Sequence, residues 1–211
     1  MRDALFMGLI TASITHEMQN VMAIVRESGA LVGDILRVNG TSRLKHGDKI
    51  IGALGNIDEQ VRRGRDLMLM LNGFAHAPTD FPSACDAVRF AAQIAPALIR
   101  LAHLRECTFS FERNTEPIHI KGNAMMLMQG IYLAGAAVLT SCAPGDTVRL
   151  IVEPFDGRVR ITVHAGNSSV TPDLGQDLTD VLRVLDGESA GAPGSCVLSL
   201  RSAAADEVRT A

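Results

Sequence analysis

The fold is decided by one stretch of sequence, Ile14-Thr15-His16-Glu17-Met18-Gln19-Asn20. Around it, apolar residues recur with the alternating four-three spacing of a helix packed in a bundle, at Ile14, Met18, Val21, Val25, Val32 and Ile35. His16 lies two residues from both Ile14 and Met18, so at about 100° per residue it points about 200° away from this apolar seam. The pattern predicts a long helix that presents a histidine to solvent, followed directly by an acid.

The seam predicts a first helix from about Asp3 to Leu36, followed by turn residues at Asn39 to Ser42. A second helix begins near Gly47, with Asp48 as its expected cap, and Pro78 ends it. Its apolar residues are Ile50, Leu54, Ile57, Val61, Met68, Leu71 and Ala75, with Gly64 at one seam position. A lone pair of helices, each about 45 Å long, leaves much of its seams uncovered, so we expect a homodimeric four-helix bundle.

The remainder of the chain mixes helices and strands. The expected helices are Cys85–Leu104, with a kink at Pro96, Asn123–Leu139 and Leu174–Leu185. The expected strands are Thr108–Phe111, Ile118–Ile120, a hairpin of Val148–Val152 with Arg158–Val163 around the turn Phe155-Asp156-Gly157-Arg158, and Cys196–Leu200. This order predicts an α+β protein with two domains: a helical hairpin over residues 1–78, and over residues 79–211 an α/β sandwich with helices on one face of a mixed or antiparallel sheet.

The composition predicts a soluble, cytoplasmic protein. Of 211 residues, 47% are hydrophobic and 20% charged, and the net charge is −3 with scattered basic residues. Because the basic residues are scattered, no nucleic-acid surface is expected. No membrane partner is expected either, because no apolar run is long enough to span a bilayer. The cysteines lie far apart in the sequence, which argues against a zinc site or a disulfide framework, at Cys85, Cys107, Cys142 and Cys196.

The motif His16-Glu17-x-x-Asn20 on the first helix of a hairpin resembles the dimerisation and phosphoacceptor domain of bacterial histidine kinases. The second half resembles a reduced version of their ATP-binding (GHKL) domain. Its run from Gly122 to Gln129 is similar to the segment that leads into the nucleotide-binding helix of that family. The strand ending Ile161-Thr162-Val163 is similar to the one that leads into the family's Asp-x-Gly motif.

This chain departs from the kinase pattern wherever the family contacts ATP. Leu133 and Ala137 stand where the family places asparagines that hold magnesium and phosphate, and Ala165 stands where an aspartate reads adenine. The glycine-rich lid is replaced by the predicted helix Leu174–Leu185. In this the chain resembles the histidine phosphotransferases that descend from histidine kinases. The resemblance implies no bound cofactor, no ATP, and relay of phosphate between response-regulator receiver domains that carry the magnesium themselves.

Three residues are the expected catalytic set. A neutral imidazole is a nucleophile for phosphoryl transfer, which assigns that role to His16. Glu17 is expected to hold the remaining ring proton, and Asn20 to contact the phosphoryl group or orient a hydrolytic water. A zincin-type metal site is excluded because Asn20 stands where such a motif needs a second histidine.

The same helix face continues into a predicted docking surface for receiver domains. Antiparallel pairing brings the later turns of the second helix level with His16. The expected partner-binding residues are Gln19, Ala23 and Glu27 on the first helix and Arg62, Arg65, Asp66 and Leu69 on the second. For each of them, an ordinary solvated helix face is the competing interpretation.

Three other functions remain open on the sequence. A kinase with a divergent nucleotide site would bind ATP. A non-catalytic module that binds a kinase or regulator would not need His16. A phosphatase of the regulator, which Asn20 can support, would release phosphate without a stable phosphohistidine.

Overall fold

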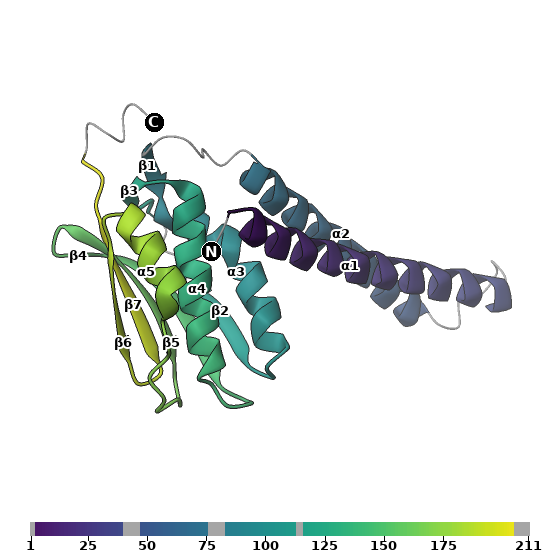
Figure 1. Cartoon of the computed structure of the whole chain (residues 1–211). Coiled ribbons are helices and arrows are strands. Elements are labelled where there is room, and N and C mark those ends of the chain that lie inside the picture. Colours follow the sequence, from purple (N-terminus) through teal and green to yellow (C-terminus); the bar gives the residue numbers. More distant parts are fainter. Residues whose placement is uncertain (1–2, 40–46, 76–82, 113–115, 205–211) are drawn as a thin grey trace. The chain divides into compact units, whose positions relative to one another are not determined.

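The computed structural model describes residues 3–39, 47–75, 83–112 and 116–204 (Figure 1). The helices are α1 (Asp3–Asn39), α2 (Gly47–Ala75), α3 (Ala87–His103), α4 (Ala124–Thr140) and α5 (Gly175–Val184). The strands are β1 (Ser83–Asp86), β2 (Thr108–Glu112), β3 (His119–Gly122), β4 (Thr147–Phe155), β5 (Arg158–Ala165), β6 (Glu188–Ala192) and β7 (Ser195–Arg201). Two compact units result, Gly8–Ala75 and Met1–Met7 with His76–Ala211.

The first of these units is a helical hairpin in which α1 and α2 lie side by side (Figure 1). The predicted seam of α1 is confirmed, since Ile14, Val21 and Ile35 are buried. Ser28 completes the row between them as a buried polar residue. The predicted first helix is also confirmed and extends three residues further, to Asn39. The turn expected after it falls largely outside the described residues.

The packing of α2 against α1 differs from the prediction. Its buried row is Ala53, Gln60 and Leu67, while the predicted Leu54, Val61 and Met68 are exposed in the single chain. The two rows are one residue apart and share a seven-residue spacing, so the sequence alone could not choose between them. The side chains of Leu71 and Ala75 lie outside the described residues.

The start of α2 is a second correction. The helix already includes Gly47, so Asp48 lies within its first turn and is not the cap. Its carboxylate there interacts favourably with the positive end of the helix dipole.

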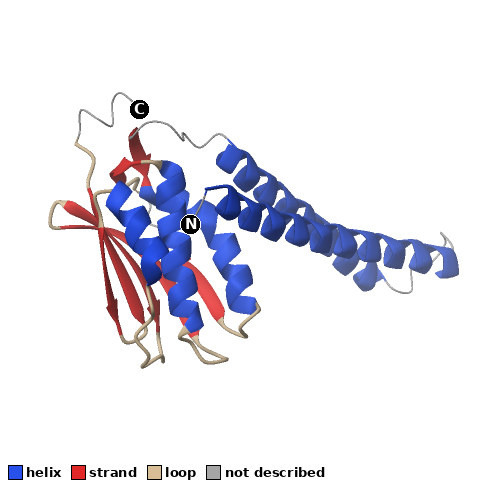
Figure 2. Cartoon of the chain, in the orientation of Figure 1, coloured by secondary structure: helices blue, strands red, loops and turns tan. Residues whose placement is uncertain are grey.

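A five-stranded sheet forms the second unit, in the order β2-β4-β5-β7-β6. β2 is parallel to β4, and every other neighbouring pair is antiparallel, which confirms the mixed sheet. Side chains along β4, β5 and β7 alternate between buried and more exposed. Figure 2 shows α3, α4 and α5 gathered on one face of the sheet, the face on which the buried residues form the core.

The β4–β5 hairpin is confirmed at the predicted turn. Asp156 and Gly157 connect the strands with φ values of 50° and 70°. Two positive φ values are the signature of a type I′ turn, whose twist matches that of the flanking strands. Both strands continue beyond the predicted ends, so that Phe155 pairs with Arg158.

Two short segments were predicted wrongly. Cys85 lies in β1 and pairs with Ile120 of β3, so the helix begins later than expected. Asp86 caps α3, because its carboxylate accepts hydrogen bonds from the backbone N–H groups of Val88 (3.0 Å) and Arg89 (3.2 Å). Strand β6 was not predicted, since its residues, Glu-Ser-Ala-Gly-Ala, carry no alternation of apolar and polar side chains.

Candidate functional site

His16 lies on the exposed surface of α1, away from the hairpin contact, as the phase of the seam predicted. The side-chain amide of Asn20, one helical turn along, donates from Nδ2 to Nδ1 of the ring at 3.4 Å. At that length the hydrogen bond is weak. The contact places Asn20 beside the imidazole, and the His16 side chain is exposed to solvent.

Glu17 is directed toward α2. Its Oε1 accepts a hydrogen bond and ion pair from Nη2 of Arg63, and the Glu17 side chain is only 19% exposed. Successive helix residues differ in direction by about 100°, which explains why His16 faces solvent while its neighbour reaches the second helix. Among the described residues, the hydrogen-bond partner of the Glu17 carboxylate is therefore Arg63 and not the imidazole ring.

Arg63 is not among the residues that the sequence predicts for the site. The prediction placed Arg62 beside His16 instead, but the side chain of Arg62 is exposed and pairs with Asp58 on its own helix at 3.2 Å. The sequence feature that could have identified Arg63 is its neighbour Gly64, a predicted seam residue. A residue adjacent to a seam position can reach the facing helix, whereas Arg62, two residues from Gly64, points away from it.

The predicted docking face of α1 contains an open, mainly apolar hollow. It is lined by Thr15, Met18, Gln19, Met22, Ala23 and Arg26. Two predicted partner-binding residues, Gln19 and Ala23, thus line it, and Glu27 is exposed on the same helix. The side chains of Arg65, Asp66 and Leu69 lie outside the described residues.

On the sheet unit, three residues that the sequence resemblance aligns with kinase nucleotide contacts carry apolar side chains. Leu133 and Ala137 are half-buried on α4, and Ala165 is buried at the end of β5. None of these side chains offers an oxygen to magnesium or to an adenine amino group. Nearby on α4, Gly130 is small enough for Val181 of α5 to pack against it. Helix α5 is therefore part of the packed core.

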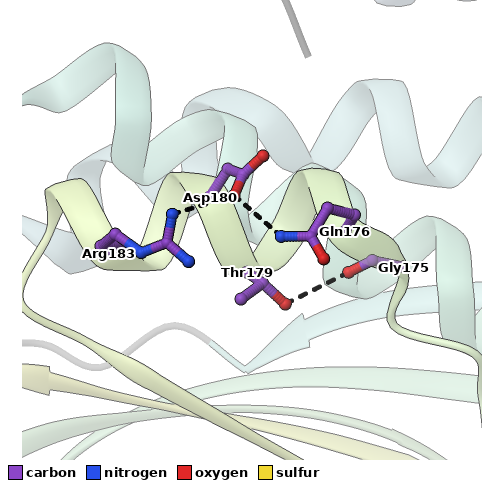
Figure 3. Close-up of polar contacts among 5 residues, drawn as sticks. All are labelled: Gly175, Gln176, Thr179, Asp180 and Arg183. Atoms are coloured by element: carbon purple, nitrogen blue, oxygen red, sulfur yellow. Dashed lines mark hydrogen bonds and ion pairs between the residues drawn. The ribbon is translucent and has the colours of Figure 1, made fainter.

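The outward face of α5 carries local polar contacts (Figure 3). Asp180 accepts hydrogen bonds from Gln176 Nε2 at 2.9 Å and from Arg183 Nη1 at 3.3 Å, and Thr179 Oγ1 donates to the Gly175 carbonyl. Gln176, Asp180 and Arg183 are three or four residues apart on one helix, the spacing of pairs that stabilise a helix. These contacts hold α5 together and do not converge on a ligand position.

All four cysteines are free thiols. Burial, followed by the neighbouring Cys107 and Asp146, raises the pKa of the Cys142 thiol to about 11. Burial raises the pKa of Cys196 to about 12. Thiols with such pKa values are almost entirely protonated at neutral pH and react slowly.

Within residues 3–39, 47–75, 83–112 and 116–204, no group of three or more histidine, cysteine or acidic side chains is placed to hold a metal ion. In the same part of the chain, no helix has the length and apolar character needed to cross a membrane.

Comparison with solved structures finds partial likenesses to histidine kinases, each with a TM-score below 0.5. No family model and no curated protein matches the chain. The nucleotide-free catalytic domain of histidine kinase ThkA has a TM-score of 0.47 at 9% identity, covering 57% of this chain and 96% of that one. Full-length ShkA in complex with AMPPNP has a TM-score of 0.49 at 18% identity, covering 89% of this chain but 46% of that one. The Acinetobacter baumannii histidine kinase AdeS has a TM-score of 0.45 at 9% identity, covering 88% and 95%.

Proposed function

We propose that this chain is a homodimeric histidine phosphotransferase of a two-component phosphorelay. His16 accepts a phosphoryl group from the aspartyl-phosphate of one receiver domain and passes it to the aspartate of another. The observation that carries the proposal is the exposed imidazole on a long packed helix, with Asn20 held against the ring.

The proposed transfer needs no cofactor on this chain. A ring nitrogen of His16 attacks phosphorus, a nitrogen–phosphorus bond forms, and the phosphorus–oxygen bond to the donor aspartate breaks, releasing that carboxylate. The second transfer runs the same exchange in reverse on another aspartate. Phosphoryl transfer depends on positioning and on neutralisation of charge, and the receiver domain's magnesium supplies most of the latter.

The apolar residues at the former ATP contacts support relay over kinase activity. A kinase must hold magnesium and the phosphates of ATP before the histidine can react. Leu133, Ala137 and Ala165 have no coordinating atom for this purpose. The phosphoacceptor is thus retained while the residues that would charge it from a nucleotide are replaced.

The dimer in the proposal rests on apolar side chains that the hairpin leaves uncovered. Leu54 (52% exposed), Val61 (57%) and Met68 (63%) form a row with a seven-residue repeat on α2. Such a row packs against helices of a second copy in a left-handed bundle. Contiguous apolar surface of this kind marks an interaction site.

The test is transfer of label from receiver domains of the source organism, phosphorylated beforehand with radiolabelled acetyl phosphate. Wild-type chain is expected to acquire label that is stable to alkali and labile to acid, as a phosphohistidine is. His16→Gln is expected to acquire none, because the nucleophile is gone. His164→Gln, which removes another exposed histidine, serves as the matched control and should be labelled like the wild type.

Three results would contradict the proposal. Labelling of the wild type from ATP would favour a divergent kinase. Release of free phosphate without labelled His16 would favour a phosphatase. Absence of label with every receiver would leave a binding module as the function.

A further inference from the structure

We propose that Arg63 is a positioning residue for phosphotransfer: it holds and neutralises the Glu17 carboxylate so that an aspartyl-phosphate can approach His16. This inference rests on the proposed function and adds to it a residue on the second helix. It treats the Glu17–Arg63 ion pair as part of the site, not as one more surface salt bridge.

The ion pair joins the two helices at the level of the nucleophile. Glu17 directly follows His16 in α1, and its Oε1 contacts Nη2 of Arg63 in α2. The two side chains are 19% and 49% exposed, so solvent and salt screen this pair less than a fully exposed one. The long side chain of Arg63 also becomes ordered across the contact, which fixes the carboxylate in one place.

The close approach of the helices at this point depends on the residue beside Arg63. A Cβ atom added to Gly64 would lie 3.3 Å from Cγ1 of Val21, tighter than ordinary van der Waals contact. A larger side chain at this position would require Val21 of α1 to shift by a few tenths of an ångström. Gly64 therefore lets the two helices lie close together beside the ion pair.

The charge argument follows from the substrate. The phosphoryl group on a receiver aspartate is negatively charged, and its transfer is sensitive to charge near the reacting atoms. An unpaired carboxylate one residue from His16 would repel it. Removing Arg63 would also leave Glu17 partly desolvated without its partner, so that the carboxylate would turn outward to reach water.

Arg37 provides a matched comparison within the same hairpin. It has the same side chain and pairs with Asp34 of α1 at 3.0 Å with both side chains largely exposed. Its removal changes the net charge of the hairpin by the same amount as removal of Arg63. It leaves the interhelical contact in place.

The experiment measures the rate of transfer from a phosphorylated receiver domain to the full chain in rapid-quench assays. Arg63→Ala is expected to slow transfer by about tenfold or more, which corresponds to about 1.4 kcal/mol in the barrier. Arg37→Ala is expected to stay within about twofold, since exposed pairs contribute little. Arg63→Lys should recover part of the rate, because it restores the charge but not the planar fork.

A double variant separates positioning from mere stability. Because the acid that needs neutralising is gone in Glu17→Gln, adding Arg63→Met to it should cost much less than Arg63→Met costs in the wild type. Thermal melting and sedimentation of each variant report folding and association. If Arg63→Ala does not fold, the transfer rate of the Glu17→Gln/Arg63→Met double variant is compared with that of Glu17→Gln. The double variant carries no buried unpaired charge.

Equal rates for Arg63→Ala and Arg37→Ala would overturn the inference, and so would independent, multiplying effects in the double variant. In either case a labelled wild type would leave the proposed function standing. Failure of the proposed function is distinct, because the wild type itself would then carry no phosphohistidine.

Discussion

The hairpin and the sheet unit bury their apolar residues to very different extents. In the sheet unit, large side chains such as Leu98, Leu150 and Ile161 are fully buried. Its exposed large apolar residues, among those described, are Leu104, Phe155, Val170 and Val184. The shorter hairpin exposes more of them: Met22, Ile24, Leu31, Leu36, Val38, Ile51, Leu54, Val61 and Met68.

The sheet unit buries its apolar residues within the chain, whereas the hairpin leaves many of its apolar residues exposed. A sheet covered by helices on one face closes its own core, so its stability is set within the chain. A pair of long helices has no third layer and leaves a second row of each helix uncovered. The unit with the uncovered surface is also the one that presents His16 to solvent.

The largest expected effect is on the closed core. Leu98→Ala removes a fully buried side chain that lies tightly against Gly135, and is expected to destabilise the chain by about 2–5 kcal/mol. Leu54→Ala, at a site 52% exposed, should change the stability of the monomer by less than about 0.5 kcal/mol. Urea unfolding followed by tyrosine fluorescence measures this, since the chain's one tyrosine, Tyr132, lies in α4. Similar losses in both variants would break the comparison.

A smaller effect is expected on association of the hairpin. Val61→Glu places a charge in the exposed row and should raise the dissociation constant of the proposed dimer by about tenfold or more, because a charge is costly to bury. Asn56→Glu adds the same charge about 140° away on α2 and is the control. Sedimentation over a range of protein concentrations measures the dissociation constant of both variants. An unchanged dissociation constant for Val61→Glu would show that the second copy uses another surface.

The last effect is absent at neutral pH, appears only in alkali, and belongs to the sheet unit, because the hairpin contains no cysteine. Burial raises the pKa of Cys196 from 9.0 to about 12, so the folded state holds its proton more tightly than the unfolded state. The stability that results is complete below pH 9.0 and is lost as the pH rises toward about 12. Cys196→Ala should show a shallower decline of the unfolding free energy over that range in urea titrations. Parallel declines in the two proteins would contradict this assignment.

Local patterns in the sequence determined much of the architecture. The four-three repeat around His16 predicted α1 and the outward direction of the histidine, because both depend only on the helical period. Asp156-Gly157 predicted the β4–β5 hairpin, since its turn requires residues that tolerate positive φ. In these cases the interactions that decide the structure lie within a few residues of one another.

Tertiary structure decided the remaining features. Two rows of α2, one residue apart, have the same spacing, and only contact with α1 buries Ala53, Gln60 and Leu67. Strand β6 forms because β7 supplies its hydrogen bonds, not because its own residues favour a strand. Arg63 reaches Glu17 because Gly64 lets two helices approach, a contact 46 residues apart in the chain. Contacts between distant segments leave no periodic signal in either segment, so they emerge only when the chain is folded.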